Sequence, residues 1–125
     1  APGLPDIAAS ADRAFHGDAE RWNPELLLLG ALAECHMMSF LHVAVRRGLV
    51  VTGYRDDPEG TLRVNADGSG EFVSAVLRPA VELAEPERRA EADGLHAEAH
   101  RLCFIARSLA FPVAWEPRDP AAAVE

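Results

Sequence analysis

The segment from Asn23 to Arg47 constrains this chain more than any other. Its sequence, NPELLLLGALAECHMMSFLHVAVRR, predicts one long and mostly apolar helix. Asn23 is a favourable N-cap, and Pro24 suits the first helical turn, where a missing N–H removes no hydrogen bond. Glu25 adds a negative charge at the positive end of the helix dipole, and Gly48 is a natural C-terminal stop. We therefore predict the first helix at 23–47.

The first half of this helix is apolar on every side. Residues 26–33 carry no polar side chain, so we expect protein to surround this half. A run of about 20 residues also matches a membrane span in length. The polar residues that interrupt the run are Glu34, His36, Ser39 and His42. Because of them, and because no aromatic belt flanks the run, we expect a buried central helix, no membrane partner and a largely dry environment for Cys35.

The rest of the chain predicts a single α+β domain. A length of 125 residues is typical of one domain. The expected elements are an irregular lead-in at 1–22, an antiparallel strand meander at 49–84, a second helix at 86–107, a last strand at 109–116 and a tail at 117–125. The three strands of the meander are expected at 49–54, 61–65 and 71–83. This order of elements predicts a sheet packed on helices.

Composition excludes several classes of function. The net charge of −8 argues against nucleic acid or an anionic membrane as a partner. All 12 basic residues are arginines, which excludes Schiff-base chemistry and lysine-dependent phosphate loops. No signal peptide is visible, which favours a cytoplasmic location.

The two cysteines, Cys35 and Cys103, are widely spaced. In a reducing cytoplasm such a pair is poorly explained by a structural disulfide. The two thiols are either a transient redox pair or inert core residues, and the pattern alone leaves both open. His96, His100 and Cys103 also fall at i, i+4 and i+7 of the predicted second helix. That spacing is compatible with a zinc site, but it also arises by chance on a buried face.

Three segments together resemble the OsmC/Ohr family of organic hydroperoxide-reducing proteins. They are NPELLLLGALAECHMMSFLH, the following GLVVTGY, and LHAEAHRLCFIARSLAFPV. The resemblance covers roughly residues 15–113. It rests on two cysteine motifs in order, separated by a strand meander, with an NPE start on the first cysteine helix. The His-Met pair after the first cysteine is more similar to the OsmC branch than to the Ohr branch.

The resemblance implies an antiparallel sheet packed on two central cysteine-bearing helices, in a tightly intertwined homodimer. It implies a peroxidase in which Cys35 is the peroxidatic cysteine, Cys103 resolves it as a disulfide, and Glu25 is the active-site acid. It also implies reduction by an external dithiol, often of the lipoyl type, with no metal or prosthetic cofactor. The alternative is a non-catalytic ligand-binding or redox-sensing module on the same fold.

The chain departs from the family pattern in two places. The family begins with two or three N-terminal strands that supply an active-site arginine, whereas this chain is predicted to start after them. Arg13 and Arg21 match no family position, so no activating arginine is assigned. Glu34 stands directly before Cys35, where small residues are common, and a carboxylate pointing at the thiol would raise the thiol pKa.

Helix geometry separates Glu25 from the cysteine of its own chain. The two residues are ten positions apart, roughly 15 Å along a straight helix. We therefore predict that Glu25 serves the Cys35 of a partner subunit, or orients an arginine there. An apolar wall is expected to favour organic peroxides over hydrogen peroxide. Its predicted members are Leu26, Leu28, Leu32, Met37, Met38, Phe40 and Phe104.

Overall fold

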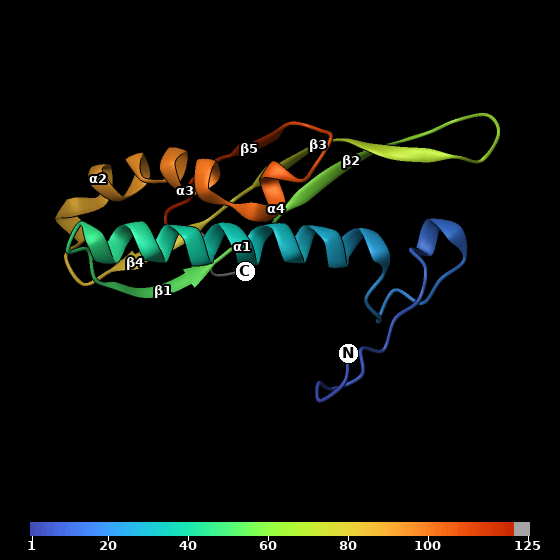
Figure 1. Ribbon diagram of the computed structural model, residues 1–125, viewed down its shortest axis with the longest axis horizontal. Coiled ribbons are helices and arrows are strands. Elements are labelled where there is room, and N and C mark those ends of the chain that lie inside the picture. The colour runs from blue at the N-terminus through green and yellow to red at the C-terminus, as the bar shows by residue number, and fades with distance from the viewer. Residues whose placement is uncertain (122–125) are drawn as a thin grey trace.

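The computed structural model describes residues 1–121 and is built around the long helix α1 (Pro24–Arg46), which runs along most of the molecule (Figure 1). Lying beside it are the short helices α2 (Arg89–Gly94), α3 (His96–Leu102) and α4 (Phe104–Arg107). The lead-in extends away from the N-terminal end of α1 and contains one 3-10 turn, η1 (Arg13–Phe15). The predicted tail lies partly outside the described residues.

Local chemistry explains both ends of α1. The Asn23 Oδ1 atom accepts a hydrogen bond from the backbone N–H of Leu26 at 2.8 Å. Pro24 occupies the first turn, where it removes no hydrogen bond. Beyond the last turn, Gly48 has a φ of +69°, a left-handed conformation that glycine adopts without strain. The helix α1 therefore covers nearly all of the range 23–47 predicted from the sequence.

One side of α1 is packed and the other side is open. Its buried residues are Leu29, Leu32, His36, Phe40, Val43 and Ala44, and its exposed ones include Leu26, Leu27, Met38 and Val45. The expectation that protein surrounds the first half is wrong for a single chain, because the rest of the chain covers one face only. The helix is long and apolar enough to cross a membrane, but the core helix of a soluble protein can share that property.

Two small sheets replace the single predicted meander. The strands are β1 (Val51–Arg55), β2 (Glu59–Val64), β3 (Gly70–Leu77), β4 (Ala80–Leu83) and β5 (Val113–Trp115). β1 pairs with β4 in antiparallel fashion, and β2 and β3 form an antiparallel hairpin. β5, which is shorter than the strand predicted at 109–116, joins β3 in parallel. The sheets are therefore mostly, but not wholly, antiparallel.

The meander prediction is wrong because the strand expected at 71–83 breaks at Arg78 and Pro79. The backbone N–H of Arg78 donates to Asp56 Oδ1 at 2.8 Å and so leaves the ladder. Pro79 has no N–H to donate. The chain changes sheet at this point, and β4 pairs with β1 instead of continuing β3.

The prediction of one continuous second helix over 86–107 is also wrong. A 3-10 turn, η2 (Pro86–Arg88), precedes α2, and α2 is followed by the separate helix α3. At Cys103 the backbone is extended, with φ −72° and ψ 113°, and this separates α3 from α4. The Cys103 sulfur accepts a hydrogen bond from the Ala106 N–H at 3.4 Å. This residue therefore ends one helix and caps the next.

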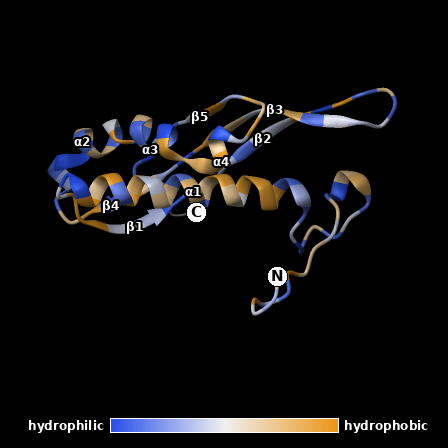
Figure 2. Cartoon of the chain, in the orientation of Figure 1, coloured by the Kyte–Doolittle hydropathy of each residue, from blue (hydrophilic) through white to orange (hydrophobic). Residues whose placement is uncertain are grey.

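Two apolar clusters hold the helices and the sheets together. The first includes Phe40, Val81 and Leu95, and the second includes Leu32, Leu77 and Cys103. Figure 2 shows that α1 is hydrophobic over much of its length, whereas the tip of the β2–β3 hairpin is hydrophilic. The second cluster places one of the two thiols in the interior, and this positions the site described next.

Candidate active site

The Cys35 and Cys103 side chains meet between α1 and the junction of α3 with α4. Cys35 packs against the apolar cluster that contains Cys103, and the two free thiols are close enough to interact. Cys103 is fully buried, whereas Cys35 is half-buried at the edge of the cluster. Two predicted site residues from distant parts of the chain are therefore brought together.

The two thiols have different surroundings. Burial raises the pKa of Cys103 to about 11; the hydrogen bond from the Ala106 N–H opposes this shift, and the neighbouring Cys35 thiol adds to it. Cys103 is therefore protonated at neutral pH. Cys35 opens into a hollow instead, so a molecule in solution can reach Cys35 and not Cys103.

The hollow beside Cys35 has a volume of about 400 Å³. Its lining residues are Cys35, Met38, Ser39, His42, Leu102 and Phe104. Met38 is 59% exposed and Phe104 is 81% exposed, so large apolar side chains stand at its opening. Within the described part of the chain, its lining includes no arginine and no carboxylate. An apolar hollow next to a thiol suits the organic part of a small molecule.

Only part of the predicted apolar wall lies at this hollow. Met38 and Phe104 line it. Leu32 and Phe40 belong to the two core clusters instead, and Leu28 faces a different hollow. The prediction was partly wrong because it grouped residues by apolarity, whereas their positions around α1 point them to different sides.

Ser39, His42 and Leu102 were not among the predicted site residues. Ser39 and His42 follow Cys35 at i+4 and i+7, so helical spacing could have found them. Leu102 could not be found in this way, because its place depends on how α3 packs against α1. Glu34 is exposed and does not line the hollow, so it is not directed at the thiol.

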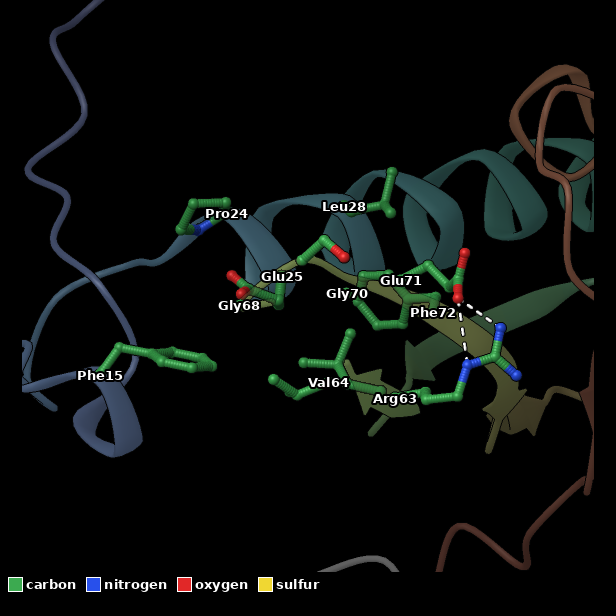
Figure 3. A pocket seen from close by; sticks show the side chains of 12 residues that line it. Phe15, Pro24, Glu25, Leu28, Arg63, Val64, Gly68, Gly70, Glu71 and Phe72 are labelled. Carbon is green, nitrogen blue, oxygen red and sulfur yellow. Dashed lines mark hydrogen bonds and ion pairs between the residues drawn. The ribbon is translucent and has the colours of Figure 1, made fainter. Parts of the chain in front are cut away.

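Glu25 lies in a second hollow, of about 380 Å³, whose lining does not include Cys35. Figure 3 shows this hollow between the start of α1, Phe15 and the β2–β3 hairpin. Arg63 on the hairpin pairs with Glu71 and not with Glu25. The Glu25 Oε2 atom is buried, and it has no hydrogen-bond partner among residues 1–121. One chain alone therefore does not bring Glu25 to a cysteine.

A group of histidines packs between α1 and α3. His36 Nε2 lies 2.9 Å from His96 Nδ1, and burial lowers the pKa of both residues to about 4. His100 packs against Trp115, with ring centroids 5.0 Å apart. Across residues 1–121, no three His, Cys, Asp or Glu side chains form a group that could hold a metal ion. The spacing of His96, His100 and Cys103 therefore does not produce a zinc site.

The sequence profile of the family described as OsmC-like protein matches residues 17–118, which is most of the chain. No curated protein sequence matches the chain significantly.

Solved structures share the fold. An OsmC-like protein of unknown function from Vibrio cholerae has a TM-score of 0.83 at 30% identity, over 94% of this chain and 80% of that one. An organic hydroperoxide resistance protein OsmC from Legionella pneumophila has a TM-score of 0.72 at 21% identity, over 92% and 81%. The organic hydroperoxide resistance protein OhrB of Bacillus subtilis has a TM-score of 0.61 at 20% identity, over 78% and 71%. The predicted α+β fold is confirmed, and the chain belongs to the OsmC-like family.

Proposed function

We propose that this protein is a thiol-dependent peroxidase that reduces organic hydroperoxides, lipid or alkyl, in defence against oxidative stress. The observation that best supports this proposal is the meeting of Cys35 and Cys103 beside an apolar hollow. One thiol is open to a substrate, and the other is buried behind it. This arrangement suits an attacking cysteine paired with a resolving cysteine. The similar structures from Legionella pneumophila and Bacillus subtilis are those of organic hydroperoxide resistance proteins, which agrees with this proposal.

In the first step, the Cys35 thiolate attacks the terminal oxygen of the hydroperoxide. The O–O bond breaks and an S–O bond forms, so Cys35 becomes a sulfenic acid. The sulfur loses two electrons, and the peroxide leaves as an alcohol after taking up a proton. The apolar lining of the hollow holds the organic group of the substrate and favours it over hydrogen peroxide.

In the second step, Cys103 attacks the sulfenic sulfur of Cys35. A disulfide forms and the oxygen leaves as water, with the proton of the Cys103 thiol balancing the reaction. Burial raises the pKa of Cys103 to about 11, so this thiol has to lose its proton as it attacks. The N–H of Ala106, which already donates to the Cys103 sulfur, stabilises the negative charge that develops there.

A dithiol from outside the protein, such as a lipoyl group, then reduces the disulfide by thiol–disulfide exchange. The electrons in this cycle pass only through the two cysteines and their reductant, and it needs no metal or organic cofactor. It fits a cytoplasmic location, where dithiol reductants keep such pairs reduced.

The protein is proposed to act as a homodimer. The open face of α1 carries exposed apolar side chains, which a second copy would cover. Glu25 has a buried carboxylate oxygen without a partner among residues 1–121, and a residue of the second copy could supply the missing contact. In this arrangement Glu25 serves the partner's Cys35, directly or by orienting an arginine.

Thiol counting after exposure to peroxide tests the proposal. The reduced protein is treated with one equivalent of cumene hydroperoxide, and free thiols are titrated with and without dithiothreitol. We expect both thiols to disappear and to return on reduction. Cys103→Ser should stop at the sulfenic acid of Cys35, which dimedone traps, whereas Cys35→Ser should not react. If both thiols persist in the wild type, the peroxidase proposal is wrong.

The same samples test the alternative, a binding or sensor module. Native mass spectrometry of the purified protein would then show a bound apolar ligand together with unchanged thiols. Stoichiometric loss of both thiols with turnover of the peroxide rules out a purely binding role.

A further inference from the structure

A buried hydrogen bond joins the two helical segments that lead to the site cysteines. His36 follows Cys35 in α1, and its Nε2 atom lies 2.9 Å from the Nδ1 atom of His96, the first residue of α3. Both rings are buried. Among residues 1–121, this is the only side-chain hydrogen bond between α1 and α3, and Phe40 and Ala99 belong to the apolar cluster that packs around it. One directional contact therefore acts within packing that has no preferred direction.

The hydrogen bond fixes the position of α3 along α1. The distance between the two nitrogens stays within hydrogen-bond range only for displacements of about 0.5 Å. At the other end of α3, the backbone N–H of Cys103 still donates to the carbonyl oxygen of His100 at 3.2 Å. Cys103 is therefore attached to the same short helix as His96 and moves with it.

The His36 ring also fixes the rotation of α1 about its own axis. It packs against His96, with ring centroids 5.2 Å apart, and against Trp115, with ring centroids 6.4 Å apart. Successive residues of a helix point about 100° apart. With His36 held in the interior, Cys35 is directed to the edge of the apolar cluster that contains Cys103. A rotation of α1 would break the contacts of His36 and displace the Cys35 sulfur.

Formation of a disulfide is sensitive to both movements. The two Cβ atoms of a disulfide lie about 3.5–4.5 Å apart, a window of only about 1 Å. A shift of α3 by the rise of one helical residue, about 1.5 Å, exceeds that window. The attack of a peroxide on Cys35 has no such requirement, because neither histidine lines the hollow that opens beside this thiol. The contact between the histidines therefore matters for one step and not for the other.

We propose that the hydrogen bond between His36 and His96 positions Cys103 to attack the sulfenic acid of Cys35. The two histidines are positioning residues for this resolving step. The inference rests on the proposed peroxidase function and adds two residues to its second step. If the resolving step is slow, a second hydroperoxide oxidises the sulfenic acid to a sulfinic acid and leaves as an alcohol. The hydrogen bond therefore protects Cys35 from irreversible oxidation.

Competition between the two fates of the sulfenic acid measures the resolving step. Reduced protein is treated with increasing concentrations of cumene hydroperoxide, and mass spectrometry gives the fractions of disulfide and sulfinic acid. The double variant His36→Leu/His96→Leu replaces both polar partners, so neither is left buried and unpaired. We expect the peroxide concentration that yields half sulfinic acid to fall about five- to tenfold, because α3 then occupies several positions along α1. The rate of sulfenic acid formation should stay within about twofold of the wild type.

Three further variants separate this role from a general effect on the fold. His96→Phe keeps a ring against Phe40, removes the same hydrogen bond and should resemble the double variant. His96→Asn places an amide where Nδ1 stood and should restore most of the wild-type behaviour. Glu98→Gln removes the ion pair of 3.3 Å between α3 and Arg47 at the surface, and it should behave as the wild type. An equal fall of both steps in the double variant, or an unchanged resolving step, overturns the inference.

A disulfide equilibrium separates this inference from the proposed function. In mixtures of reduced and oxidised glutathione, the equilibrium constant for the disulfide of Cys35 with Cys103 reports how closely the two thiols are held, without any peroxide. We expect this constant to fall about five- to tenfold in the double leucine variant. Such a fall, in a protein whose thiols do not react with peroxide, supports the positioning role and refutes the peroxidase. Peroxide turnover with an unchanged equilibrium constant and an unchanged resolving step supports the peroxidase and refutes the positioning role.

Discussion

His36 and His96 form a buried imidazole pair between α1 and α3, with His36 Nε2 and His96 Nδ1 2.9 Å apart. One proton lies between these two nitrogens, so one ring donates and the other accepts. The remaining nitrogens, His36 Nδ1 and His96 Nε2, have no hydrogen-bond partner within residues 1–121. The pair therefore joins the helix of Cys35 to the helix that precedes Cys103 through one hydrogen bond between two neutral rings.

Acidification is expected to destabilise this pair. Burial is the main cause that lowers the pKa of each histidine from 6.5 to about 4, and His100 adds to the effect on His36. Between these two values the unfolded chain binds more protons than the folded protein. The free energy of unfolding therefore falls as the pH decreases from 6.5 to about 4. We expect a loss on the order of 3 kcal/mol, measured by urea unfolding at about pH 7 and about pH 4.5.

Two histidine variants isolate the contribution of the pair. His96→Gln keeps a hydrogen-bond donor and an acceptor but does not titrate. The free energy of unfolding of this variant should therefore depend less on pH than that of the wild type. His16→Asn is the control, because His16 is exposed in the lead-in and asparagine tolerates its positive φ of 66°. If both variants keep the wild-type dependence on pH, other groups cause it.

Cys103 is expected to contribute more to stability than Cys35. Cys103→Ala removes a fully buried sulfur that also caps α4, so we expect a loss of about 1–2 kcal/mol in the free energy of unfolding. Cys35→Ala changes a half-buried side chain that caps no helix and should cost less than about 1 kcal/mol. Urea unfolding of both variants under reducing conditions measures the difference. An equal loss in the two variants would contradict the capping role of the sulfur.

The sequence predicted best where local chemistry decides the structure. The start of α1 depends on Asn23 and Pro24, and its length follows from an uninterrupted run of helix-compatible residues. The two cysteines could be assigned to one site because each lies in a motif similar to the family pattern. These features depend on residues that are near one another in the chain, and the profile and structure comparisons agree on the family.

The sequence could not predict features that depend on contacts between distant segments. No glycine or proline marks the helix break at Cys103. There the Cys103 sulfur, in place of a backbone carbonyl, accepts the hydrogen bond from the Ala106 N–H. The pairing of β1 with β4 requires the chain to leave β3 at Arg78, and this departure depends on a contact with Asp56. The contact between His36 and His96 likewise follows from the packing of α3 on α1.

The N-cap of α1 gives a direct test of what stabilises the central helix. Asn23→Ala removes the side-chain oxygen that accepts from the Leu26 N–H and should lower the free energy of unfolding by about 1 kcal/mol. Asn23→Ser is the matched control, because serine is an equally good N-cap, and it should stay within about 0.5 kcal/mol of the wild type. Thermal or urea unfolding measures both. Equal destabilisation by the two substitutions would show that the hydrogen bond is not the cause.

The role proposed for Glu25 predicts a loss of activity without a loss of stability. The Glu25 Oε2 atom has no hydrogen-bond partner within residues 1–121. Glu25→Gln should therefore change the free energy of unfolding by less than about 1 kcal/mol. If the carboxylate acts at the partner's Cys35, kcat/KM for cumene hydroperoxide should fall by roughly 10- to 100-fold. Glu34→Gln, an exposed change beside Cys35, should not lower activity.

Mixed dimers show which subunit Glu25 serves. Glu25→Gln and Cys35→Ser subunits are each expected to be nearly inactive alone. When the two are unfolded together and refolded, a mixed dimer has one intact Cys35 facing the intact Glu25 of the other subunit. Activity should therefore return toward half of that of a wild-type dimer in the mixed species, because one of its two sites is complete. If Glu25 acted on the cysteine of its own chain, every site in the mixed dimer would lack one of the two residues, and the mixture would stay inactive.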